Sequence, residues 1–166
     1  MFKNIIMYQK ILLPSYFKKI GWWILIPTTL VGIILFITGV ENAPSWMNLH
    51  VFAFFNEELL GETRLFTVIQ TNITATVVSI FFIIGGYFVG FSKEKNEDEY
   101  IAQTRLYALL WAVKVNYILL IISLLFIYGL SFLYVMLYNM FTVLVLFIFR
   151  FNFMLFINAK SITGEK

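Results

Sequence analysis

The stretch Asn96–Leu120, NEDEYIAQTRLYALLWAVKVNYILL, decides the fold, because a charged helix start runs without a break into an apolar segment. Asn96 and Glu99 have the spacing of a capping box, and the acids of residues 97–99 fill a first helical turn, where the helix dipole favours negative charge. Neither Pro nor Gly occurs from Asn96 to Tyr128. The sequence predicts a helix of about 50 Å, longer than the roughly 30 Å core of a bilayer, so we expect a membrane span whose start projects into water.

The composition is that of an integral membrane protein. The 166 residues are 61% hydrophobic and 13% charged, whereas soluble domains carry about 25% charged residues. The chain has no cysteine and one histidine, His50, which excludes disulfides, thiolate ligands and a histidine metal cluster within one chain. No nucleophile–base pair can be built around a single histidine, so we expect no catalytic residue, no metal and no cofactor.

Residues 1–166 are expected to form a single transmembrane domain with an all-α, four-helix fold. The predicted spans are about 20–40, 73–91, 106–128 and 132–149. Pro27 is expected to kink the first span, and Gly129–Ser131 is the expected turn between the last two. Gly86 and Gly90 form a G-x-x-x-G pair in the second span, which allows another helix to pack closely.

The segments outside the predicted spans differ in character. Residues 1–19 are basic, and their first part, 1–13, is consistent either with an amphipathic helix in the membrane interface or with a frayed tail. A loop over 41–72 is acidic, and within it Trp46–Phe55 is expected to lie on the membrane surface as a short helix. A second charged loop covers 92–105.

The basic residues predict the orientation of the spans. Eleven of the 12 Lys and Arg residues lie on or near one side of the predicted membrane, and Arg64 alone lies on the other. Cytoplasmic loops carry the excess of Lys and Arg, so the sequence predicts that both termini and the loop 92–105 are cytoplasmic. The loop 41–72 is then the outer loop.

Five polar residues lie in or near the last two spans, where such groups are functional candidates by default. They are Lys114, Asn116, Asn139, Arg150 and Asn152. Lys114 and Arg150 can extend to the inner interface, so each is either an interfacial anchor or part of a site. Asn139 and Arg150 are 11 residues apart and share a helix face, which favours a hydrogen bond between helices that fixes their packing.

The candidate partner-binding surface is an acidic run followed by Arg105. The acids are Glu94, Glu97, Asp98 and Glu99. Three interpretations stay open for them: a cation site, a docking patch for a partner, or the solvated start of a capped helix. There is no large basic patch of the kind that predicts nucleic-acid binding.

Three segments together resemble a known family. They are GFSKEKNEDEY (Gly90–Tyr100), LLWAVKVNYILL (Leu109–Leu120) and MLYNMFTVLVLFIFRFN (Met136–Asn152). The chain resembles an uncharacterised family of small four-span proteins of the bacterial inner membrane, whose members are often encoded beside a small helix-turn-helix transcriptional regulator. The resemblance implies a membrane protein that holds or signals to a cytoplasmic regulator.

The sequence therefore favours a non-enzymatic membrane sensor or tether, in contact with the lipid bilayer, that binds a cytoplasmic partner through residues 94–105. One alternative is the protomer of a small homo-oligomeric transporter or channel, which would use Lys114, Asn116, Asn139 and Arg150. Another is an accessory subunit of a larger membrane complex. A lipid-active enzyme is disfavoured, because the acidic run has no partner group for catalysis.

Overall fold

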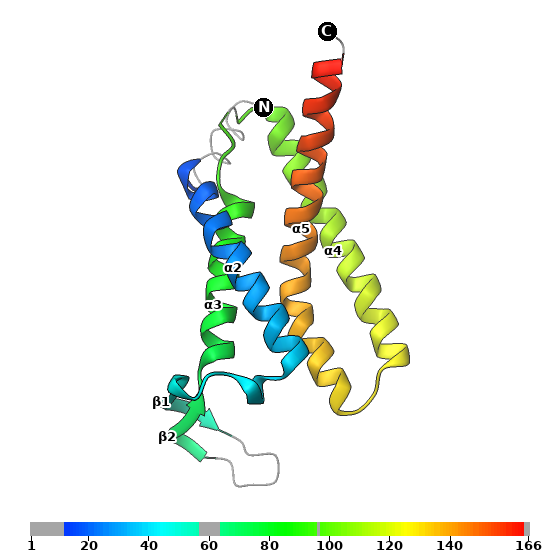
Figure 1. The fold of residues 1–166 in the computed structure, drawn as a ribbon. Helices are drawn as coiled ribbons and strands as arrows, with labels where there is room; N and C mark the ends of the chain where they lie inside the picture. Colours follow the sequence, from blue (N-terminus) through cyan, green and yellow to red (C-terminus); the bar gives the residue numbers. More distant parts are fainter. Residues whose placement is uncertain (1–11, 57–63, 96, 165–166) are drawn as a thin grey trace. The chain divides into compact units, whose positions relative to one another are not determined.

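The computed structural model describes residues 12–56, 64–95 and 97–164 (Figure 1). The helices are α2 (Tyr16–Thr38), α3 (Thr74–Phe91), α4 (Glu99–Phe126) and α5 (Leu130–Gly164), and the strands are β1 (Asn48–Asn56) and β2 (Arg64–Asn72). The chain forms two compact units, and each is described by itself. One unit is Ile26–Phe82, and the other contains the chain up to Leu25 and from Ile83 onward.

Within the described ranges, four helices are long and apolar enough to cross a membrane, which confirms the prediction of a largely helical chain with four candidate membrane spans. With 28 and 35 residues, α4 and α5 measure about 42 and 53 Å, so both exceed a bilayer core. The longer is α5, which continues well past the predicted end at 149. The orientation of the termini stays a prediction, and the expected interfacial segment 1–13 lies mostly outside the described residues.

Helix α4 begins later than predicted. Its N-cap is Asp98, whose Oδ1 accepts a hydrogen bond of 2.8 Å from the backbone N–H of Ile101. The predicted capping box that starts at Asn96 is wrong, and Asn96 itself lies outside the described residues. Asp and Asn cap helices about equally well, so the local sequence offers two starts. The contact that Glu97 makes with Arg105, described below, selects the later one.

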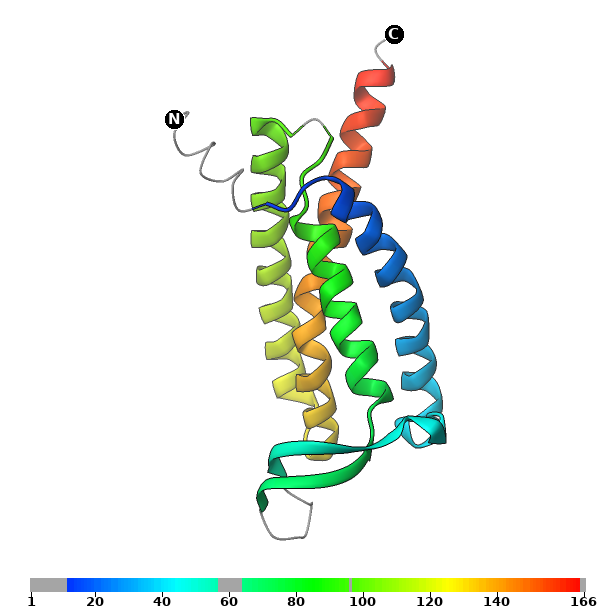
Figure 2. The same ribbon diagram turned by 90° about the vertical axis from the view of Figure 1, so that its left-hand side faces the viewer.

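The unit Ile26–Phe82 contains a β-hairpin, so the prediction of an all-α fold is wrong in this region. Strands β1 and β2 pair antiparallel, with His50 opposite Gln70 and Val51 opposite Ile69 (Figure 2). The prediction of a surface helix over Trp46–Phe55 is wrong for the same reason. The sequence of β2, RLFTVIQTN, is rich in β-branched residues, which favour a strand. Strand β2 also provides the hydrogen-bonding partners for the aromatic-rich segment Asn48–Asn56, which therefore forms strand β1.

The hairpin is tied to the start of α3. The Asn72 side-chain amide donates a hydrogen bond of 3.0 Å to the Pro44 carbonyl, and the Ile73 N–H donates one of 3.1 Å to the Met47 carbonyl. Three aromatic rings on the hairpin are exposed and contact one another edge to face or tilted; they are Phe52, Phe54 and Phe66. The hairpin therefore places an aromatic surface directly before a membrane-spanning helix.

In the other unit, small residues let the helices approach closely. A Cβ added at Gly85 of α3 would lie 2.9 Å from the backbone N of Leu25 in α2. Gly86 and Gly90 face α5 instead, where Gly86 meets Leu144 and a Cβ at Gly90 would lie 2.7 Å from Phe147. The two predicted packing glycines thus contact a helix of the same chain.

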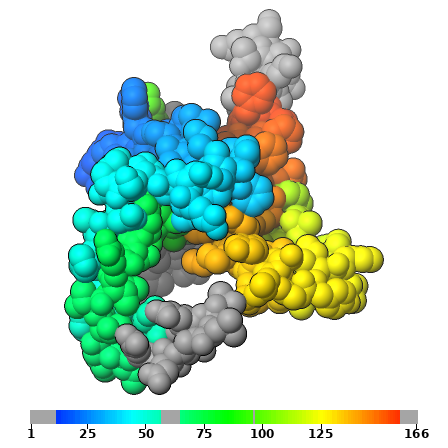
Figure 3. Space-filling view, turned by 60° about the horizontal axis from the view of Figure 1, so that its bottom comes forward, coloured from blue at the N-terminus to red at the C-terminus, as the bar shows by residue number. Residues whose placement is uncertain are grey.

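The turn between α4 and α5 lies at the surface, as Figure 3 shows for the segment drawn in yellow. Gly129 has a φ of 68°, a left-handed conformation that glycine adopts without strain. Phe126 and Tyr128 beside it are 77% and 75% exposed, as expected for side chains that face lipid or the membrane interface. The turn was predicted at Gly129–Ser131 and ends at Leu130, where α5 begins.

Two glycine substitutions separate close packing from helix propensity. We expect Gly85→Ala to lower the free energy of unfolding by about 1–3 kcal/mol, because the new methyl group meets backbone that cannot move aside. Thermal unfolding in detergent measures the change. The control is Gly32→Ala, whose Cβ would meet only Val78 at 3.8 Å and which should be neutral or stabilising. Equal effects of the two substitutions would show that the close approach at Gly85 is not required.

Candidate functional site

Polar side chains of the unit that contains α4 and α5 gather in three places. The first is the connector between α3 and α4, of which residues 92–95 and 97–98 are described, and its first part runs beside Leu13. The Leu13 N–H donates a hydrogen bond of 3.0 Å to the Phe91 carbonyl, and the Lys93 N–H donates one of 2.8 Å to the Leu13 carbonyl. Lys18 of α2 forms an ion pair with Glu94. The connector is therefore held at its first half by both backbone and side chain.

Arg105 of α4 holds the second half of the connector. It is 3% exposed, and its Nη2 donates a hydrogen bond of 3.2 Å to Oε2 of Glu97, whose side chain is also buried. The same Glu97 oxygen accepts a hydrogen bond of 2.7 Å from the backbone N–H of Glu94. One carboxylate oxygen thus joins the start of the connector to the third membrane-spanning helix.

An aromatic ring completes this buried cluster. Phe151 of α5 is fully buried, with the Arg105 guanidinium 4.9 Å from its ring centroid and the Lys18 ammonium 5.7 Å from it. Cation–π contact and ion pairing offset part of the cost of burying the guanidinium. Three buried polar atoms of the pair have no hydrogen-bond partner among the described residues: Glu97 Oε1, Arg105 Nε and Arg105 Nη1.

The five residues predicted to form a docking surface are therefore not equally accessible. Glu97 and Arg105 are buried against each other, and Glu94 is paired with Lys18. Asp98 and Glu99 are exposed at the start of α4. In the conformation of the structure, a partner can reach two of the five directly.

The second place is a pair of asparagines that joins α4 to α5. Asn116 donates a hydrogen bond of 3.2 Å to the Asn139 side-chain oxygen, and Asn139 donates one of 3.1 Å back to Asn116. Asn116 is buried, so each amide satisfies a polar group that lipid could not satisfy. Asn152 makes a different contact: it donates to the Ile148 carbonyl of its own helix at 2.8 Å.

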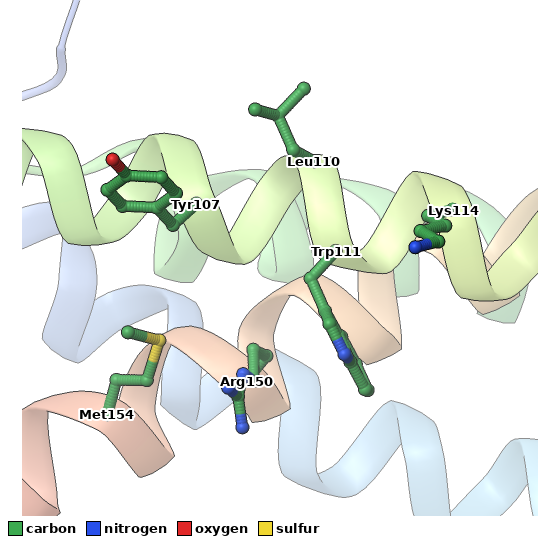
Figure 4. A pocket seen from close by; sticks show the side chains of 6 residues that line it. All are labelled: Tyr107, Leu110, Trp111, Lys114, Arg150 and Met154. Atoms are coloured by element: carbon green, nitrogen blue, oxygen red, sulfur yellow. The ribbon is translucent and has the colours of Figure 1, made fainter.

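The third place is an open cavity of about 410 Å³ on α4 and α5, drawn in Figure 4. Its lining residues are Tyr107, Leu110, Trp111, Lys114, Arg150 and Met154. Trp111 extends from α4 toward α5, and the Arg150 guanidinium lies 5.2 Å from the centroid of its ring. The cavity contains two cations and no carboxylate.

Sequence reasoning singled out Lys114 and Arg150 but missed the aromatic residues beside them. The available signal was helical spacing, since Tyr107, Trp111 and Lys114 recur at intervals of four and three and so share one face of α4. Arg150 and Met154 share a face of α5 in the same way. That both faces meet at one cavity follows from helix packing, which spacing within one helix does not reveal.

Within the described part of the chain, no three His, Cys, Asp or Glu side chains lie close enough together to hold a metal ion. The chain matches no family model, no curated protein and no solved structure in the comparisons made. The resemblance to the small four-span bacterial family stays a prediction. Fold and sites together define a class, a largely helical protein with four candidate membrane spans, a small β-hairpin and polar clusters along its two longest helices.

The asparagine pair should show strong coupling in unfolding. Asn116→Leu leaves Asn139 without its partner, and the reverse holds for Asn139→Leu. We therefore expect the double variant to lose less free energy of unfolding than the two single variants lose together, by about 0.6–2 kcal/mol. Unfolding in detergent–denaturant mixtures measures each variant. Asn116→Leu combined with Asn152→Leu is the control and should be additive, because Asn152 bonds only its own helix. Additivity in both pairs would contradict the interhelical bond.

Glu97 should control the mobility of the connector. Glu97→Gln keeps the shape of the side chain but removes the charge that pairs with buried Arg105, and breaking a buried pair costs about 3–5 kcal/mol. We expect amide hydrogen exchange in residues 93–98 to become at least about tenfold faster, since about 1.4 kcal/mol corresponds to a factor of ten. Glu99→Gln, at an exposed position on the next turn, should leave this exchange unchanged. Slow exchange in both variants would show that the ion pair does not hold the connector.

Proposed function

We propose that the protein is a non-enzymatic membrane sensor or tether that binds a cytoplasmic partner through residues 94–105. The single observation that supports this best is the buried Glu97–Arg105 pair. It holds a charged connector against the helices while Asp98 and Glu99 remain exposed. The surface would present more charge when the connector is released from the helices than when it is held against them.

The connector is suited to two states because polar contacts hold its charged residues in place. Its contacts are the two backbone hydrogen bonds at Leu13, the Lys18–Glu94 pair and the Glu97–Arg105 pair. They involve α2, α4 and, through Phe151, α5, so a small shift of one helix weakens several contacts at once. A signal acts on this equilibrium only if it favours one state over the other.

Release of the connector would complete the docking surface. The exposed acids Asp98 and Glu99 would then be joined by Glu94, Glu97 and Arg105. Charges of both signs in a fixed order steer a partner and set its orientation more than they raise affinity. The three unpartnered atoms of the Glu97–Arg105 pair lower the cost of release, because fewer hydrogen bonds have to be broken.

The resemblance suggests which partner and which membrane. A small helix-turn-helix regulator in the cytoplasm would be held at the bacterial inner membrane, and the protein itself would not contact nucleic acid. The excess of Lys and Arg on one side supports cytoplasmic termini.

The transporter or channel alternative receives less support from the geometry. Asn116 and Asn139 satisfy each other, and Arg150 packs on Trp111. These contacts favour packing over conduction within one protomer. The accessory-subunit alternative is supported by the many exposed apolar side chains on the helices, although lipid alone would also cover these.

Capture of the partner tests the proposal. The variant Asp98→Asn, Glu99→Gln removes two exposed charges and preserves the N-cap of α4, because Asn caps as well as Asp. We expect it to reduce the partner recovered with the tagged protein from native membranes at least about fivefold. We expect Lys18→Gln to raise recovery, because it removes a contact that holds the connector without removing a residue of the docking surface. Mass spectrometry in a mild detergent measures both.

The matched control for this experiment is Glu41→Gln, which removes an exposed acid from a 3-10 turn before the hairpin. It should leave recovery unchanged. Recovery that is the same for wild type, for the double variant Asp98→Asn, Glu99→Gln and for Lys18→Gln would contradict the tether. A defined homo-oligomer as the only recovered species would favour the transporter or channel.

A further inference from the structure

Two cations of α4 and α5 have no acidic partner in the part of the chain that the structure describes. The ion pairs there use Lys18 and Arg105, whereas Lys114 and Arg150 line the open cavity without a carboxylate. A cavity with a net charge of +2 beside an apolar helix surface attracts a ligand that is both anionic and apolar.

The helical rise places these cations near a membrane boundary. Lys114 and Arg150 are 15 and 21 residues from Gly129 in the α4–α5 turn, which corresponds to about 23 and 32 Å along the helices. A hydrocarbon core of roughly 30 Å that begins at this turn ends between the two residues. The cavity therefore lies at the depth of lipid phosphates, on the side opposite the turn, and Lys114 reaches that depth by extending its side chain.

The aromatic residues prepare the cavity for a phosphate. The Arg150 guanidinium lies against the Trp111 ring, which restricts its motion and leaves its N–H groups free to bind two oxygens of one phosphate. The Trp111 indole, which extends toward α5, carries a further N–H donor, whereas the Tyr107 hydroxyl points away from Arg150 (Figure 4). Beyond Lys114, α4 continues with exposed Ile118 and Ile121, along which an acyl chain can lie.

We propose that this cavity binds an anionic glycerophospholipid, with its phosphate between Lys114 and Arg150 and its acyl chain along α4. The inference is independent of the proposed function, since it involves neither the connector nor a protein partner. A lipid with a zwitterionic headgroup carries the same phosphate, but its ammonium group meets two unpaired cations and is disfavoured. Free phosphate lacks the acyl chain that the apolar lining accommodates.

Native mass spectrometry of the delipidated protein in a non-ionic detergent tests this site. The probes are phosphatidylglycerol, phosphatidylcholine with the same acyl chains, and glycerol phosphate as the headgroup without chains. Each cation near an anionic headgroup is expected to change affinity about fivefold, so phosphatidylglycerol should bind about 25-fold tighter to wild type than to Lys114→Gln, Arg150→Gln. Arg150→Lys should fall between them, because it retains the charge but not the paired N–H groups.

The matched control is Lys19→Gln, Lys95→Gln, which removes the same charge from two exposed positions outside the cavity. It should retain the affinity of wild type. Equal binding of phosphatidylglycerol and phosphatidylcholine to wild type would overturn the proposal even if the double variant failed to fold. So would an equal loss in the control, which would indicate attraction by net charge, or glycerol phosphate binding as tightly as the lipid, which would indicate a free-phosphate site.

Discussion

The burial of the Arg105 guanidinium is the constraint on which the connector between α3 and α4 depends. A guanidinium retains its charge, and taking an ion out of water costs several kcal/mol unless other groups replace the water. Glu97 supplies an opposite charge, and Phe151 supplies a ring face. Glu97 makes this contact from outside the helix, because the N-cap of α4 is Asp98 and the helix starts at Glu99. The N-cap at Asp98 and the ion pair of Glu97 with Arg105 therefore occur together at the start of α4.

The membrane-spanning part of the fold could be predicted from the sequence because its cause is local. A bilayer offers no hydrogen bonds to the backbone, so long apolar runs become helices whatever their neighbours are. The hairpin could not be predicted in the same way. A segment such as WMNLHVFAFF has apolar residues compatible with either a surface helix or a strand, and its partner residues in β2 lie further along the chain, from Leu65 opposite Phe55 to Asn72 opposite Asn48. The choice between the two is made by pairing, which acts over a long distance in sequence.

The same distinction between local sequence and distant contacts applies to the candidate sites. Lys114, Asn139 and Arg150 could be selected from the sequence, because a polar group inside an apolar helix is unusual by itself. Their contacts could not, since Asn139 bonds Asn116, another of the selected residues, on a different helix, and Arg150 stacks on Trp111, which was not selected. The acidic run shows the converse case. Its members look equivalent in sequence, yet Glu97 is buried on Arg105 while Glu99 is exposed, and the difference depends on which helix lies beneath each side chain.

Arg105 and Arg150 show how one chain uses the same interaction for two purposes. Each guanidinium lies about 5 Å from an aromatic ring, Phe151 for the first and Trp111 for the second. Arg105 is also paired with a carboxylate and closed off from solvent, so its charge is used within the protein. Arg150 has the ring but no carboxylate, and it borders an open cavity that also contains Lys114. A ring orients a cation without neutralising it. The charge of Arg150 therefore remains available to a group from outside the chain, and at this depth in a membrane the nearest anionic groups are those of lipids.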